Sequence, residues 1–160
     1  MTNINKLIQD LTLKEKISLM SGFNSWYTNK IERLGVPSIK MSDGPNGVRG
    51  DSTSGKSSAC FPCAISIGST WDMDLINQLG VALGEEAKVK DVDVLLGPTI
   101  NIHRHPLGGR HFESFSEDPF LTGKIATEYV KGVQSQNVAA CLKHFIGNDT
   151  EYERHLVSSN

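Results

Sequence analysis

Apolar residues recur at helical spacing near the start of the chain. Thr12 and Glu15 form a Thr-x-x-Glu capping box, in which each side chain can bond the other residue's backbone N–H. This pattern predicts a helix that begins after Thr12 and stops at Gly22, since glycine commonly ends helices. A shorter helix is predicted just before it, over residues 4–11.

Two longer helices are predicted further along the chain. Asp72 can cap the first, because its carboxylate can accept from the free N–H groups of the opening turn. Asp118 can cap the second, and Pro119 follows it at the first helical position, where the missing N–H of proline costs nothing. One apolar face then repeats in each helix: Leu75, Ile76, Leu79, Leu83 and Ala87 in the first, and Leu121, Ile125, Tyr129 and Val133 in the second.

Short apolar runs bounded by turn residues predict strands between the helices. We assign them to residues 37–42, 64–69, 92–97 and 138–143. Strands that alternate with helices form a parallel sheet, so the predicted fold class is α/β. We interpret the units as roughly the first half of a (β/α)8 TIM-type barrel, preceded by N-terminal helices. Residues 1–160 would form one incomplete domain, because a closed barrel takes about 250 residues.

The composition is that of a globular protein, with 38% hydrophobic and 21% charged residues. The formal net charge is −2 and no stretch is basic, so nothing favours a nucleic acid or a membrane surface as partner. No apolar run approaches the roughly 20 residues of a membrane-spanning helix, and no signal-peptide core is recognisable. Together with three cysteines, an odd number, these features predict a cytoplasmic location.

Cys60 and Cys63 have the spacing of a redox motif. Redox function requires a helix N-terminus that lowers the pKa of the thiol. Because the pair precedes the predicted strand at 64–69, we interpret these cysteines as ordinary thiols, and we expect no cofactor.

Charged residues gather after the predicted strands, at the end where an α/β barrel builds its site. The first cluster is Asp43 with Arg49, the second spans residues 101–113, and the third begins with Lys143 and His144. A carboxylate can accept from two neighbouring hydroxyls while lysine, histidine and arginine donate, so this mixture suits a sugar. The pair of cations directly after an apolar strand would be costly to bury unless an acceptor lies nearby.

Each cluster also has an alternative interpretation. Asp43 precedes Gly-Pro and could simply shape a turn. In the third cluster, we interpret Glu151 and Glu153 as facing solvent. The second cluster would fit a metal-dependent hydrolase if its histidines bound a metal ion, namely His103, His105 and His111.

Three segments together resemble the N-terminal barrel domain of glycoside hydrolase family 3, on its β-glucosidase side. They are Met-Ser-Asp-Gly-Pro-Asn-Gly-Val-Arg-Gly (41–50), Pro-Leu-Gly-Gly-Arg-His-Phe-Glu-Ser-Phe-Ser-Glu-Asp-Pro (106–119) and Cys-Leu-Lys-His-Phe-Ile-Gly-Asn-Asp (141–149). The resemblance covers nearly the whole chain from about Leu11, and both the order and the spacing of the segments fit. It implies a metal-free, retaining enzyme that hydrolyses terminal nonreducing β-D-glucosyl residues.

The resemblance also implies which residues bind the substrate, a β-glucoside or an oligosaccharide. In the family such residues grip the ring hydroxyls and help to distort the sugar toward an oxocarbenium-like transition state. The matching positions here are Asp43, Arg110, Lys143, His144 and Arg154, with Arg49 in support.

The two catalytic carboxylates of the family have no counterpart in this sequence. The family nucleophile is the Asp of a Ser-Asp-Trp-like segment on a later barrel strand, and the acid/base is a Glu of a following α/β domain. Both are expected beyond Asn160. We therefore expect a β-glucosidase fragment that is inactive alone and self-associates through exposed barrel edges. The alternative is a non-catalytic or vestigial sugar-binding protein.

Overall fold

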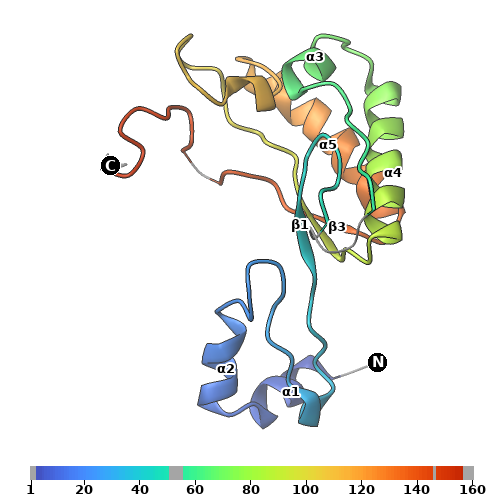
Figure 1. Cartoon of the computed structure of the whole chain (residues 1–160), viewed down its shortest axis with the longest axis vertical. Coiled ribbons are helices and arrows are strands. Elements are labelled where there is room, and N and C mark those ends of the chain that lie inside the picture. The colour runs from blue at the N-terminus through green and yellow to red at the C-terminus, as the bar shows by residue number, and fades with distance from the viewer. Residues whose placement is uncertain (1–2, 51–55, 146, 157–160) are drawn as a thin grey trace. The chain divides into compact units, whose positions relative to one another are not determined.

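The structure is a computed structural model that describes residues 3–50, 56–145 and 147–156. It contains two compact units, residues 1–41 and residues 42–160, which are described one at a time. Figure 1 shows the helices and strands of both units. Within the described ranges, no helix is long and apolar enough to cross a membrane.

The first unit contains three helical elements: α1 (Ile4–Asp10), α2 (Leu13–Leu19) and the 3-10 helix η1 (Glu32–Leu34). The predicted capping box is confirmed, because the Glu15 N–H donates to Thr12 Oγ1 at 3.3 Å and the Thr12 N–H donates to Glu15 Oε2 at 2.8 Å. Arg33 holds the same carboxylate through bonds of 2.7 and 2.5 Å. The helix ends before the predicted Gly22, which instead forms an isolated bridge with Thr28.

A three-stranded sheet of order β1-β2-β3 organises the second unit. Its strands are β1 (Met41–Asp43), β2 (Val94–Leu96) and β3 (Ala139–Ala140). β2 and β3 run parallel, with Val94 beside Ala139 and Leu95 beside Ala140. The predicted α/β class and parallel pairing are therefore confirmed, although each strand is shorter than its predicted range.

The strand predicted at 64–69 is wrong, because this segment forms the helix α3 (Ala64–Gly68). An apolar run of this length has no periodicity that separates a strand from one helical turn, and burial decides the outcome. Ala64 and Ile67 face the core, and Gly68 lies so close to the Phe115 carbonyl that an added Cβ would approach its oxygen to 2.4 Å. The cysteine pair therefore precedes a helix, and its thiols are free.

Both predicted long helices are confirmed as α4 (Met73–Val89) and α5 (Pro119–Ser135), side by side in Figure 1. Their N-caps are also confirmed. Asp72 Oδ1 accepts from the Leu75 N–H at 3.0 Å, and Asp118 Oδ1 accepts from the Phe120 N–H at 2.9 Å.

Two glycines allow α4 and α5 to cross closely. A Cβ on Gly80 would lie 2.4 Å from the Tyr129 carbonyl oxygen, and a Cβ on Gly132 would lie 2.3 Å from the Asn77 carbonyl oxygen. Tyr129 is buried beside this crossing, and its hydroxyl donates to the Pro45 carbonyl at 3.0 Å. α5 thereby fixes the turn that follows β1, where the first predicted cluster lies.

Candidate functional site

The first and third clusters meet at the carboxyl ends of β1 and β3. Asp43 ends β1, and Lys143 follows β3 in a parallel bridge with Thr99. The Lys143 Nζ donates to Asp43 Oδ1 at 2.6 Å, although 100 residues separate the two in sequence. Backbone bonds hold Lys143 in place, because its N–H donates to the Pro98 carbonyl at 3.0 Å and its carbonyl accepts from the Ile100 N–H at 2.7 Å.

The partners of Asp43 keep its side chain ionised. Burial alone would raise the pKa of Asp43, but the hydrogen bond and charge of Lys143, with the charge of Arg49, hold it below the ordinary value of 3.8. Arg49 is exposed, and its N–H donates to the Asp43 carbonyl at 3.0 Å. Asp43 is therefore a ready acceptor at neutral pH, and the turn that the alternative interpretation expected also exists around it.

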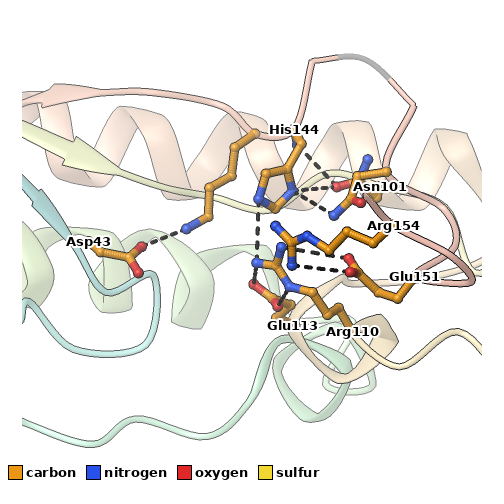
Figure 2. Close-up of polar contacts among 9 residues, drawn as sticks. Asp43, Asn101, Arg110, Glu113, His144, Glu151 and Arg154 are labelled. Atoms are coloured by element: carbon orange, nitrogen blue, oxygen red, sulfur yellow. Dashed lines mark hydrogen bonds and ion pairs between the residues drawn. The ribbon is translucent and has the colours of Figure 1, made fainter. Parts of the chain in front are cut away.

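His144 joins the third cluster to the second (Figure 2). Asn101 Oδ1 accepts from the His144 backbone N–H at 3.0 Å and lies 3.0 Å from its ring Nδ1. A proton on Nδ1 satisfies that contact and leaves Nε2 to accept from Arg110 Nη2 at 3.4 Å. Asn148 Nδ2 lies 3.4 Å from the same Nδ1, so Asn101 fixes the orientation of the ring rather than its tautomer.

His144 should titrate below its ordinary pKa of 6.5, because burial first and then the positive charges of Arg110 and Lys143 lower the pKa. The imidazole is then neutral at pH 7, and the stability that goes with the neutral ring is lost as the pH falls from the unfolded value through the folded one. An NMR titration of the ring should give a midpoint below 6.5 that rises in Arg110→Gln. A midpoint above 6.5 in the unchanged chain would contradict this arrangement.

Two carboxylates share the guanidinium of Arg110 (Figure 2). Arg110 donates to Glu113 through Nε at 2.5 Å and through Nη2 at 3.0 Å, and its Nη1 lies 3.8 Å from Glu151 Oε1. Arg154 donates to the other Glu151 oxygen at 3.1 Å. The hydrogen bond to Glu113 raises the pKa of Arg110, so this guanidinium stays charged throughout.

Glu151 does not face solvent, so that interpretation is wrong. Its side chain is only 20% exposed, because Arg110 and Arg154 draw it into the cluster. The interpretation of Glu153 is confirmed, since this residue is exposed. The difference arises because Glu151 precedes Arg154 by one helical-type turn and can bend back to it, as the i,i+3 ion pair shows.

Sequence patterns alone give no site role to Asn101, Glu113 or Glu151. Asn101 and Glu113 lie inside the second predicted cluster, but a list of charged positions does not tell which carboxylate compensates which arginine. The site residues assigned from the sequence contain more cations than carboxylates. Because buried charges are normally paired, this excess indicates that further carboxylates lie nearby.

The three histidines of the second cluster bond to backbone groups. His103 Nε2 lies 2.9 Å from the Ser114 carbonyl, His111 Nε2 lies 3.0 Å from the Asp149 carbonyl, and their rings stack at 5.1 Å. His105 Nδ1 accepts from the Leu107 N–H at 3.2 Å. Within residues 3–50, 56–145 and 147–156, no group of three or more His, Cys, Asp or Glu residues is placed to hold a metal ion. Two of these rings instead fasten the loop that carries Arg110.

Several known proteins with similar sequences are named as β-glucosidases. The chain is 55% identical to a β-glucosidase of Rhizobium radiobacter over 159 residues, which are 98% of this chain and 19% of that protein. It is 54% identical over 157 residues to a putative β-glucosidase of Schizosaccharomyces pombe, again 98% of this chain and 19% of the relative. The chain therefore spans about a fifth of the length of the curated relatives it matches.

Solved structures show the same similarity. A β-glucosidase from Kluyveromyces marxianus in complex with glucose matches with a TM-score of 0.90 and 47% identity, over 94% of this chain and 18% of that one. β-Glucosidase 3B from Thermotoga neapolitana in complex with glucose matches with a TM-score of 0.84 and 40% identity, over 92% of this chain and 24% of that one. The family model described as the glycosyl hydrolase family 3 N terminal domain matches residues 4–159, and the chain belongs to this family.

Proposed function

We propose that this chain forms the sugar-gripping part of the nonreducing-end glucose site of a retaining β-glucosidase. One observation carries the proposal: Asp43, Lys143, His144 and Arg110 converge at one edge of the sheet in a family 3 chain. Figure 2 shows Asp43, His144 and Arg110 of this group. The similar enzymes from Kluyveromyces marxianus and Thermotoga neapolitana were solved with glucose, which supports glucose as the ligand.

The chemistry of the cluster matches a ring that carries several neighbouring hydroxyls. Asp43 would accept from two of them, since an ionised carboxylate has free acceptor sites besides the one that Lys143 uses. Lys143, Arg110 and Arg154 would donate to hydroxyl oxygens, and the neutral His144 would add a further polar contact. Arg49 would support Asp43 by its charge. Hydrogen bonds that involve charged groups are about twice as strong as neutral ones, so they can orient a sugar firmly.

We further propose that the sheet is about the first half of an eight-stranded barrel, and that the rest of a longer polypeptide completes it. The relatives extend well beyond the matched region, because that region is only 19% of their length. A retaining glycosidase needs a carboxylate nucleophile and a separate acid/base about 5–5.5 Å apart. Those two groups would come from the additional polypeptide, while this chain would hold and distort the sugar.

The 160-residue chain alone should not hydrolyse an aryl β-D-glucoside above background. The same chain should do so when it replaces the matched 159 residues of the Rhizobium radiobacter β-glucosidase, 55% identical, in what we call the joined protein. The reason is that binding residues orient a substrate but supply neither nucleophile nor proton donor. Release of the chromophoric aryl alcohol measures the activity of the isolated chain and of the joined protein.

Two outcomes would contradict this proposal. Turnover by the purified chain alone that disappears in Lys143→Ala would mean that the chain contains a catalytic group of its own. A joined protein that folds and binds glucose without turning over the aryl glucoside would favour the alternative, a sugar-binding protein without catalysis.

A further inference from the structure

In the candidate site, one buried carboxylate oxygen beside Arg110 and Arg154 has no hydrogen-bond partner among the described residues. Glu151 Oε1 is buried, and no donor lies within hydrogen-bonding distance of it among the described residues. The nearest cationic nitrogen is Arg110 Nη1, at 3.8 Å, which is an ion-pair distance. The other oxygen of the same carboxylate accepts from Arg154 at 3.1 Å. Glu151 therefore lies between two guanidinium groups and acts on one of them through charge alone.

Glu151 orients Arg154, whereas Arg110 is oriented by another carboxylate. Glu113 already binds Arg110 through two N–H groups, the bidentate geometry that fixes a guanidinium plane. Arg154 is 56% exposed along its side chain, and Glu151 is its recorded ion-pair partner. A long, exposed side chain would otherwise sample many rotamers, so Glu151 is the group that keeps Arg154 beside Arg110.

At the Arg110 and Arg154 end of the site, the charges balance only when Glu151 is counted. Lys143 is paired with Asp43, and Arg110 is paired with Glu113. Arg154 is then a surplus cation unless Glu151 cancels it. His144 adds no charge at neutral pH because its pKa lies below the ordinary value. Without Glu151, the sugar would meet a site with a net positive charge at the Arg110 and Arg154 end.

We propose that Glu151 is a positioning and specificity residue, which holds Arg154 beside Arg110 and cancels its charge so that the site prefers a neutral sugar to an acidic one. This inference rests on the proposed function, because it takes for granted that the cluster binds a sugar. A sugar that carries a carboxylate would bind more tightly to an arginine pair without a counter-charge. Glu151 already supplies a carboxylate beside these arginines, so the sugar gains nothing from its own.

The test compares the affinities of the joined protein for D-glucose and D-glucuronate, two sugars that differ by one carboxylate. Glu151→Gln removes the charge and keeps the size of the side chain, and Glu151→Asp restores the charge on a shorter side chain. Glu153→Gln is the matched control, since it makes the same chemical change on an exposed residue two positions away. Binding is measured by titration calorimetry after circular dichroism has confirmed equal folding.

Glu151→Gln should raise the ratio of glucuronate affinity to glucose affinity by about tenfold at low salt, because one negative charge near the arginines is removed. The gain should shrink as salt approaches about 0.1 M and beyond, where partly exposed charges are screened. Glu151→Asp should return the ratio most of the way to that of the unchanged chain, and Glu153→Gln should leave it unchanged. If Glu151 had a merely structural role, its replacement would lower the affinities for glucose and glucuronate equally and would create no preference for the anionic sugar.

An unchanged ratio in Glu151→Gln overturns the inference, and so does an equal shift in Glu153→Gln. The proposed function fails separately, if the joined protein with an unchanged Glu151 folds and binds neither sugar. In that case the appearance of glucuronate binding in Glu151→Gln still supports charge cancellation by Glu151, and its absence counts against it.

Discussion

Asp43→Ala in the joined protein is expected to lower kcat/KM for an aryl β-D-glucoside by about 10²-fold or more. Asp43 would accept from two sugar hydroxyls, and hydrogen bonds to charged groups contribute about 1.5–3 kcal/mol each. Its removal also leaves Lys143, whose side chain is only 16% exposed, without the carboxylate that it bonds at 2.6 Å. Steady-state kinetics measure the loss as a change in transition-state stabilisation.

Glu153→Ala is the control for this experiment. Glu153 is exposed, so its truncation should change the transition-state stabilisation, calculated from kcat/KM, by less than about 1 kcal/mol. Glu151→Ala is not a suitable control, because Glu151 pairs with Arg110 and with Arg154. If Asp43→Ala is nearly neutral in a protein that folds normally, the sugar does not lie on Asp43.

Gly132→Ala is expected to destabilise the chain by about 3 kcal/mol, even though alanine is the better helix former. The added Cβ would lie 2.3 Å from the Asn77 carbonyl oxygen and 2.8 Å from Gly80 Cα, both of them backbone atoms of α4. Neither can move away like the end of a flexible side chain, so the two helices would have to separate. Urea unfolding followed by circular dichroism measures the change in the free energy of unfolding.

The matched control is Gly123→Ala in the same helix. Nothing lies within 4 Å of a Cβ at Gly123, so this change should stabilise the chain by about 0.5–1 kcal/mol through helix propensity alone. Opposite signs at the two glycines are the expected result. A similar effect of both changes would mean that α4 and α5 do not approach closely at Gly132.

Local signals predicted those parts of the fold that local physics decides. The capping side chains of Thr12, Asp72 and Asp118 bond backbone groups within four residues, so the sequence around each is sufficient to place a helix start. The segment at 64–69 was mispredicted because its conformation depends on contacts that the local sequence does not contain. Gly68 packs on the carbonyl group of Phe115, which lies far along the chain.

The candidate site divides in the same way. Asp43 and Lys143 could be assigned because both lie at the ends of predicted apolar strands, and parallel strands bring such positions to one edge. The involvement of Glu151 could not be predicted from its neighbours, since Glu153 has the same side chain two positions later and is exposed. What distinguishes them is the position of Arg110, which belongs to a distant loop.

The bond between Asp43 and Lys143 has a consequence for synthesis on the ribosome. Lys143 is added 100 residues after Asp43, which at about 5–20 residues per second is a delay of about 5–20 s. During that delay the carboxylate has no partner from β3, and the neighbouring Arg49 is the cation that its own segment supplies. The ion pair at the sheet edge therefore closes only late in synthesis, and a nascent chain interrupted before Lys143 would contain the acceptor Asp43 without its donor.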